Sequence, residues 1–213
     1  MSDRRAVYLV RHGATAWNKE GRIIGHEDIG LGEGGREQAR TAARILAPCR
    51  VDLVVSSPLS RTLETARAVA ADHDLEPEVD EGIVELRLAG WAGRTRAELA
   101  AEKAWQRWLR EPHTIATPEG ERLVDVRDRA MGALRRGLDR LPEGGGLVLV
   151  THGGVIRVIL LTLLGMPLSS YQKVRADPGS VSALELGSDG ELAVLLGCNL
   201  GDPRRALRRG KPT

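Results

Sequence analysis

Short, continuous apolar runs recur along this chain, and segments with helical spacing separate them. The clearest runs cover residues 6–10, 51–56 and 147–151, and each is rich in Val and Leu. Runs of this length without polar alternation are typical of strands buried on both faces of a parallel sheet. Weaker candidate strands cover residues 78–84, 181–186 and 191–197.

Helical segments are predicted between these strands. One follows Gly34-Gly35, two cover residues 96–110 and 121–141, and an apolar one follows His152-Gly153. A further helix is predicted to begin at Ser57-Pro58, because serine caps helix starts and proline fits the first turn. Its apolar face carries Leu59, Leu63, Ala66 and Ala70. The alternation of strands and helices predicts an α/β fold, with a mostly parallel sheet and helices on both faces.

Composition narrows the class of protein. A chain of 213 residues fits one domain, which we place at residues 1–201, and the basic stretch 202–213 is expected to be a mobile tail. The net charge of +2 and the 3% aromatic content argue against a nucleic-acid partner. Two cysteines make no disulfide framework.

Membrane insertion and export are not expected. The most apolar stretch, residues 155–164, contains Arg157 and is shorter than the ~20 residues that a membrane span needs. The first residues lead into only a short apolar run, so no signal peptide is predicted. We therefore expect a cytoplasmic protein, and a homodimer is compatible with the sequence.

Side chains suited to catalysis or ligand binding follow directly after the apolar runs. Arg11-His12 follow the first strand, Arg61 and Glu85 follow the next two, and His152 follows the fourth. Open α/β sheets form their ligand crevice at the carboxyl ends of the strands. We expect these side chains to meet there.

Together they suit a phosphomonoester. Two arginines can hold phosphate oxygens, one neutral imidazole can attack phosphorus, and the second can stabilise the developing charge. A carboxylic acid can protonate the leaving oxygen and then activate water. The helix start at Gly153 adds a favourable place for the anion. This chemistry needs neither a metal ion nor a cofactor.

Four motifs in this order resemble the histidine phosphatase superfamily, also called phosphoglycerate mutase-like. They are Leu9-Val10-Arg11-His12-Gly13-Ala14-Thr15-Ala16-Trp17-Asn18, Ser56-Ser57-Pro58-Leu59-Ser60-Arg61-Thr62-Leu63-Glu64-Thr65-Ala66, Glu85 with Trp91 and Gly93, and Val150-Thr151-His152-Gly153-Gly154. The resemblance spans roughly residues 6–198. It implies a three-layer α/β/α sandwich. One departure is the stretch from Leu88 to Gly93, which lacks the first glycine and the second glutamate of the usual family pattern.

The resemblance also implies roles for single residues. His12 is the residue phosphorylated in a covalent intermediate, Glu85 is the proton donor, and Arg11, Arg61 and His152 bind the phosphoryl group. Asn18 resembles a further phosphate contact. Substrate contacts are also expected at Thr15, Gly25, Gly153 and His113.

Several activities remain open. The short segment from Glu85 to Glu121 favours a phosphatase over a cofactor-dependent phosphoglycerate mutase, which usually carries a longer insertion. Residues 106–113 and 118–121 resemble phosphoserine phosphatases, with α-ribazole phosphatases and broad-specificity phosphatases as alternatives. The partner is then a small phosphorylated metabolite. Two hypotheses from other functional classes are a regulatory module that binds a phosphorylated ligand and a metal hydrolase. The two histidines lack the spacing of a metal-ligand motif.

Overall fold

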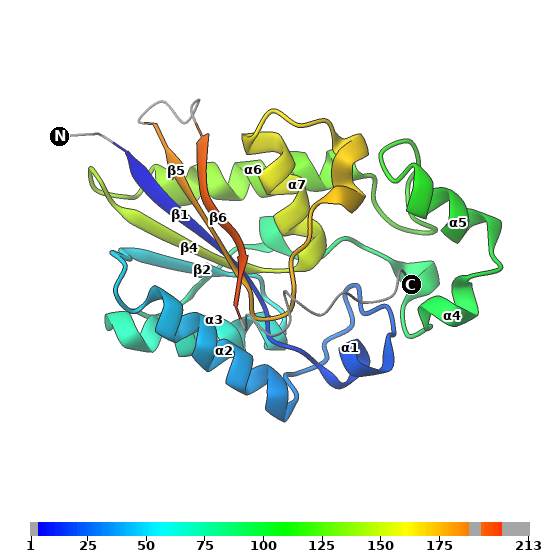
Figure 1. Ribbon diagram of the computed structural model, residues 1–213, viewed down its shortest axis with the longest axis horizontal. Coiled ribbons are helices and arrows are strands. Elements are labelled where there is room, and N and C mark those ends of the chain that lie inside the picture. Colours follow the sequence, from blue (N-terminus) through cyan, green and yellow to red (C-terminus); the bar gives the residue numbers. More distant parts are fainter. Residues whose placement is uncertain (1–3, 188–192, 202–213) are drawn as a thin grey trace.

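A computed structural model describes residues 4–187 and 193–201, so the predicted tail at 202–213 lies outside the described residues. It shows one six-stranded sheet in the order β3-β2-β4-β1-β5-β6 (Figure 1). The strands are β1 (Arg5–Arg11), β2 (Leu53–Ser56), β3 (Glu78–Val79), β4 (Gly146–Thr151), β5 (Val181–Leu186) and β6 (Ala193–Leu200). The first four are mutually parallel, and β5 and β6 join in antiparallel fashion. The predicted α/β fold with a mostly parallel sheet is confirmed.

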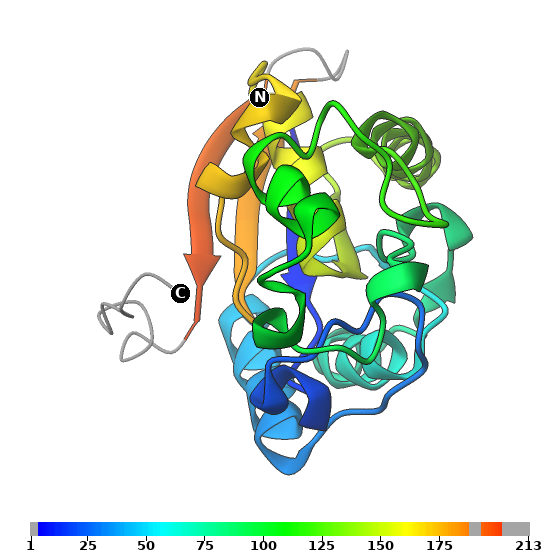
Figure 2. The same cartoon turned by 90° about the vertical axis from the view of Figure 1, so that its right-hand side faces the viewer.

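Helices cover both faces of the sheet (Figures 1 and 2). On one face lie α2 (Glu33–Leu46) and α3 (Ser60–Ala70), and on the other lie α6 (Leu123–Leu138) and α7 (Gly153–Leu163). The strands feed both cores, because successive side chains alternate between faces. Leu9 packs into the core beneath α6 and α7, whereas Val10 packs against α2 and α3.

Shorter elements connect the strands and the longer helices. They are α1 (Ala16–Glu20), α4 (Arg96–Leu99), α5 (Lys103–Arg110) and the 3₁₀ turns η1 (Ala71–His73), η2 (Glu81–Ile83), η3 (Ala89–Trp91) and η4 (Leu168–Lys173). Within the described ranges, no helix has the length and apolarity needed to cross a bilayer.

The predicted start of the helix at Ser57-Pro58 is wrong. Helix α3 begins at Ser60, with Leu59 as its cap residue and no capping bond from Ser57. Asp28, from a distant loop, accepts hydrogen bonds from the Ser60 amide and hydroxyl, both at 2.8 Å. Ser57 instead bonds His152. The capping rule failed here because the residue that binds the start of the helix is distant in the sequence.

Two further boundaries differ from the prediction. Only Glu78–Val79 of the expected strand 78–84 pairs with β2, because the Asp80 carboxylate caps η2 by accepting from the Gly82 amide at 2.8 Å. The expected helix 96–110 is two helices, α4 and α5, with a break between Leu99 and Lys103.

The loop after β1 lies against the first turn of α2 through two glycines. A Cβ atom on Gly13 would overlap the carbonyl oxygen of Gly35, and one on Gly35 would overlap that of Ala14. Neither position accepts a side chain without moving backbone. This contact sets where the chain emerges beyond β1.

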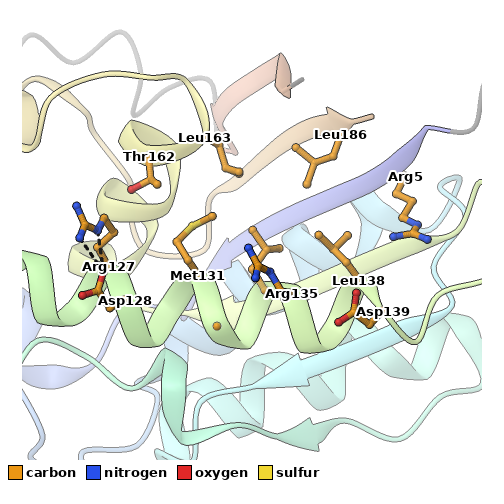
Figure 3. A pocket seen from close by; sticks show the side chains of 12 residues that line it. Arg5, Arg127, Asp128, Met131, Arg135, Leu138, Asp139, Thr162, Leu163 and Leu186 are labelled. Carbon is orange, nitrogen blue, oxygen red and sulfur yellow. Dashed lines mark hydrogen bonds and ion pairs between the residues drawn. The ribbon is translucent and has the colours of Figure 1, made fainter. Parts of the chain in front are cut away.

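A pocket with a volume of about 580 Å³ lies at the other end of the sheet. Figure 3 shows the side chains that line it. Arg5 and Leu186, which pair across β1 and β5, lie on its wall with residues of α6 and α7. Arg5 starts β1 and Arg11 ends it, roughly 20 Å away along the strand. Arginines and aspartates share the rim, where Arg127 pairs with Asp128. None of the predicted catalytic residues lines this pocket.

Candidate active site

The predicted catalytic side chains converge at the carboxyl ends of β1, β2 and β4. Arg11 ends β1 and His12 follows it, Arg61 lies in the first turn of α3, and His152 precedes α7. The rings of His12 and His152 are 5.2 Å apart between centroids, at 61°. His12 is 2% exposed, and Arg61 and His152 are 0% exposed. Arg61 is not among the apolar residues that predicted the buried face of its helix, yet the structure buries it entirely.

His12 is oriented by its own loop. Its Nδ1 lies 2.7 Å from the carbonyl oxygen of Gly13, which can only accept, so Nδ1 carries the proton. Nε2 then holds the lone pair that a nucleophile needs. Burial, together with the positive charges of Arg11 and Arg61, holds the pKa of His12 well below its ordinary value of 6.5. The ring is therefore neutral at pH 7.

His152 is held from the opposite side. Its Nε2 lies 2.7 Å from the Ser57 hydroxyl. Its Nδ1 is buried and has no hydrogen-bond partner among the described residues. Burial first, and then the charge of Arg61, lowers the pKa of His152 well below 6.5.

The two arginines use their terminal nitrogens to hold loops. Arg11 Nη1 donates to Ala176 O at 2.7 Å, and Arg61 donates to Glu27 O at 2.7 Å and Gly25 O at 2.8 Å. The Nε atoms of both are buried without a partner in the described structure. Burial lowers the pKa of Arg11 to about 10, so it stays charged at neutral pH.

Within residues 4–187 and 193–201, six buried side-chain nitrogens lack a partner, and three of them, Arg11 Nε, Arg61 Nε and His152 Nδ1, belong to the predicted catalytic side chains. Buried polar groups are nearly always satisfied, so a cluster of exceptions on neighbouring side chains requires an explanation. A bound oxyanion offers acceptors of the kind that these three nitrogens lack.

Two glycines bring other site groups close to the start of α7. A Cβ on Gly153 would lie 3.2 Å from Arg11 Cζ, and one on Gly154 would lie 2.5 Å from Glu85 Oε1. The Gly154 amide donates to Glu85 Oε2 at 3.5 Å, and the Leu86 amide donates to Oε1 at 2.9 Å. Glu85 thus lies at the same helix end as Arg11, within the predicted crevice.

Sequence reasoning missed the residues that hold the Glu85 segment. Arg129 on α6 donates to the carbonyls of Gly82, Val84 and Glu85 at 2.9, 2.6 and 3.1 Å. Its guanidinium also forms a two-point ion pair with Glu121, at 2.9 and 3.0 Å. His26 Nε2 lies 2.6 Å from the Glu85 carbonyl oxygen. No short-range sequence signal links these residues to Glu85.

We expect Arg129→Ala to lower kcat by ~10- to 100-fold with a smaller change in KM, because displacing a reacting group by about 1 Å has effects of this size. Arg129→Lys should restore little, since an ammonium cannot bind three carbonyls and a carboxylate together. Arg127→Ala on the same helix, where Arg127 pairs with Asp128 at the surface, is the matched control. Steady-state kinetics on a phosphomonoester provide the measurement, and wild-type kcat in Arg129→Ala would contradict the positioning role.

The residues predicted to contact the substrate differ in how close they lie to the catalytic side chains. Thr15 and Asn18 form a reciprocal cap of α1, with Thr15 N to Asn18 Oδ1 at 3.0 Å and Asn18 N to Thr15 Oγ1 at 3.2 Å. Thr15 is wholly buried in that role. Gly25 uses its carbonyl to bind Arg61, and Gly153 packs on Arg11. His113 is exposed after α5, and no described hydrogen bond or ion pair joins it to the catalytic residues.

Comparison with known proteins decides the family. Residues 7–199 match the family described as the histidine phosphatase superfamily (branch 1). The chain belongs to the histidine phosphatase superfamily. The predicted family and enzyme class, a phosphatase of this superfamily, are confirmed.

Relatives of this histidine phosphatase carry several names. Phosphoserine phosphatase 1 of Hydrogenobacter thermophilus is 32% identical over 92% of this chain and 94% of its own. A probable phosphoglycerate mutase of Cronobacter sakazakii is 36% identical over 84% of each chain. The structure of the mycobacterial glucosyl-3-phosphoglycerate phosphatase with VO3 has a TM-score of 0.85 and 31% identity, covering 92% of this chain and 100% of that one.

Proposed function

We propose that this histidine phosphatase hydrolyses a small phosphomonoester without a metal ion, by way of a phosphohistidine at His12. The observation that carries the proposal is the group of three unpartnered nitrogens, on Arg11, Arg61 and His152, beside a histidine whose Nε2 bears the lone pair. The two cationic arginines and the neutral donor of His152 offer one donor for each of the three oxygens of a transferring phosphoryl group.

The first half of the reaction transfers the phosphoryl group to the protein. His12 Nε2 forms a bond to phosphorus as the bond from phosphorus to the ester oxygen breaks. Glu85, protonated at this stage, gives its proton to the departing alkoxide. Arg11, Arg61 and His152 bind the equatorial oxygens, where charge accumulates in the transition state.

The second half returns the histidine to its starting state. Glu85, now a carboxylate, removes a proton from water as the water oxygen bonds to phosphorus. The bond from phosphorus to His12 Nε2 breaks, and inorganic phosphate forms. Glu85 regains its proton, so protons and bonds balance over one turnover.

Metal independence is supported by the kinds of side chain at the site. Two arginines already supply the positive charge that a metal ion would otherwise bring. In the described part of the chain, no three side chains of His, Cys, Asp or Glu gather in a way that could hold a metal ion.

A small acidic metabolite is the proposed substrate class. Relatives named for phosphoserine and glucosyl-3-phosphoglycerate support phosphatase activity on such compounds. A relative named a probable phosphoglycerate mutase keeps mutase activity as the second candidate. The short segment between Glu85 and Glu121 favours hydrolysis. Asn18 and His113 are retained as proposed substrate contacts, and a cytoplasmic location agrees with such a substrate.

We expect full hydrolysis of p-nitrophenyl phosphate in excess EDTA, and inhibition by vanadate, which mimics five-coordinate phosphorus. A release assay for inorganic phosphate on phosphoserine and the phosphoglycerates then compares natural esters. Activity that EDTA removes and a divalent ion restores would contradict the metal-free mechanism. Interconversion of phosphoglycerates faster than phosphate release would replace the phosphatase by the mutase.

A further inference from the structure

The last strand of the sheet is apolar, and its outer edge is not paired with another described strand. Strand β6 pairs only with β5 among the described strands, and Figure 2 shows it at the free margin of the sheet with no helix outside it. Its exposed side chains include Val194, Leu195, Leu196 and Leu200, at 38%, 38%, 59% and 43% exposure. The other exposed large apolar residues of the described chain, Val79, Leu109 and Met166, lie apart on separate segments.

The two edges of this one sheet differ sharply. At the opposite edge, β3 is two residues long, and its Glu78 is paired with Arg140. Short length and charge are the usual protections of a free edge against pairing with another chain. Strand β6 has eight residues, Ala-Val-Leu-Leu-Gly-Cys-Asn-Leu, with no charge and no proline. Its register with β5 shifts at two places, between Val181 and Ala183 and between Ala183 and Leu184, and Asn199 near its end has a φ of 56°, so the regular part of the strand is its first half.

Apolar side chains of β6 emerge on both faces of the sheet. Leu195 pairs with Leu184, whose side chain belongs to the core beneath α6 and α7. Leu200 pairs with Val181, which belongs to the core beneath α2 and α3. An occupant of this edge would therefore contact apolar groups above and below, besides the backbone groups of β6 that point away from β5.

We propose that β6 pairs with β6 of a second copy of this chain, antiparallel across a two-fold axis. In such an arrangement each strand pairs with an identical strand that runs in the opposite direction. Because β6 carries no charge, the pairing brings no like charges together. The backbone N–H and C=O groups of the free edge are satisfied, and the apolar side chains of one copy cover those of the other. The charged neighbour on β5, Glu185, is already paired with Arg4 and does not oppose the contact.

The expected strength follows from the size of the contact. Stable protein interfaces bury roughly 1,200–2,000 Å². One pair of eight-residue strands is a small contact on this scale, so we expect a dimer that dissociates reversibly on dilution. The active site lies at the ends of β1, β2 and β4 and remains complete in each copy.

Sedimentation velocity of the full chain from roughly 1 to 100 μM tests the proposal, because the mass of a reversible dimer depends on concentration. We expect twice the chain mass of 23.1 kDa at the upper end. Leu196→Lys and, separately, Val194→Lys should raise the dissociation constant by ~100-fold or more, because like charges then face each other across the axis. Leu109→Lys, at 45% exposure on α5, is the matched control and should remain dimeric.

Activity on p-nitrophenyl phosphate reports folding, and both β6 variants should keep it. Hydrogen exchange should show the outward amides of β6 protected in the wild type at high concentration and exposed in Leu196→Lys. A wild type that stays monomeric at every concentration overturns the proposal. This result is expected if a different protein binds β6. A dimer that survives both lysine variants also overturns it, since the interface then lies elsewhere.

Discussion

The variant His12→Ala is expected to lose at least ~10⁴-fold in kcat, the scale seen when a nucleophile is removed from a working site. The methyl group cannot form the covalent intermediate. His152 is not expected to substitute, because its Nε2 bonds Ser57 and its Nδ1, in the proposed mechanism, carries the proton that it donates to a phosphoryl oxygen. Incubation with a labelled phosphomonoester, followed by quenching, should give acid-labile protein-bound phosphate in the wild type and none in the variant.

The matched control is His73→Ala, the same substitution in η1, away from the strand ends that form the site. It should keep wild-type kcat and the same yield of phosphoenzyme. Labelled intermediate in His12→Ala would refute the assignment of the nucleophile. Full turnover in that variant would refute the proposed reaction as a whole.

Glu85→Gln has the second largest expected effect, a ~10²- to 10⁴-fold loss of kcat on esters with poor leaving groups. Glutamine keeps the shape of the side chain and can still accept from the Leu86 amide, but it can neither give nor take the proton. Phosphoserine therefore loses both the protonation of its leaving oxygen and the activation of water.

A good leaving group separates these two steps. p-Nitrophenolate departs without a proton, so Glu85→Gln should release about one equivalent of it in a burst and then turn over slowly. Rapid-mixing absorbance records the burst, and the phosphoenzyme should accumulate. Equal losses on both substrates without a burst would show that Glu85 orients the site and carries no proton. Wild-type rates would assign the proton to another group.

Local sequence patterns were enough for much of this protein. The buried strands β1, β2 and β4 were predictable, because apolar runs of their length have no solvent-facing side. Since parallel strands end at one edge, Arg11, Arg61 and His152 could be expected together before any contact was known. The burial of Arg61 was not predictable, because an arginine on a helix is usually solvated.

The remaining features depend on residues far apart in sequence. Asp28 caps α3, and Arg129 binds the carbonyls of the Glu85 segment, across 32 and 44 positions. Neither contact leaves a periodic pattern or a motif. Ser57 has the sequence signature of a helix cap, yet its hydroxyl is used by His152. At Ser57 the local rule failed because its hydroxyl has a partner 95 positions away.

The contact between Gly13 and Gly35 has a genetic consequence. Gly35 belongs to α2 and contributes no atom to the proposed chemistry, but any side chain there would push α2 away from the loop that carries His12. A screen of random substitutions scored by growth or turnover would thus find Gly35 as essential as the nucleophile. Essentiality at such a position measures how closely two backbones approach, and it would mislead anyone who used it to map where the substrate binds.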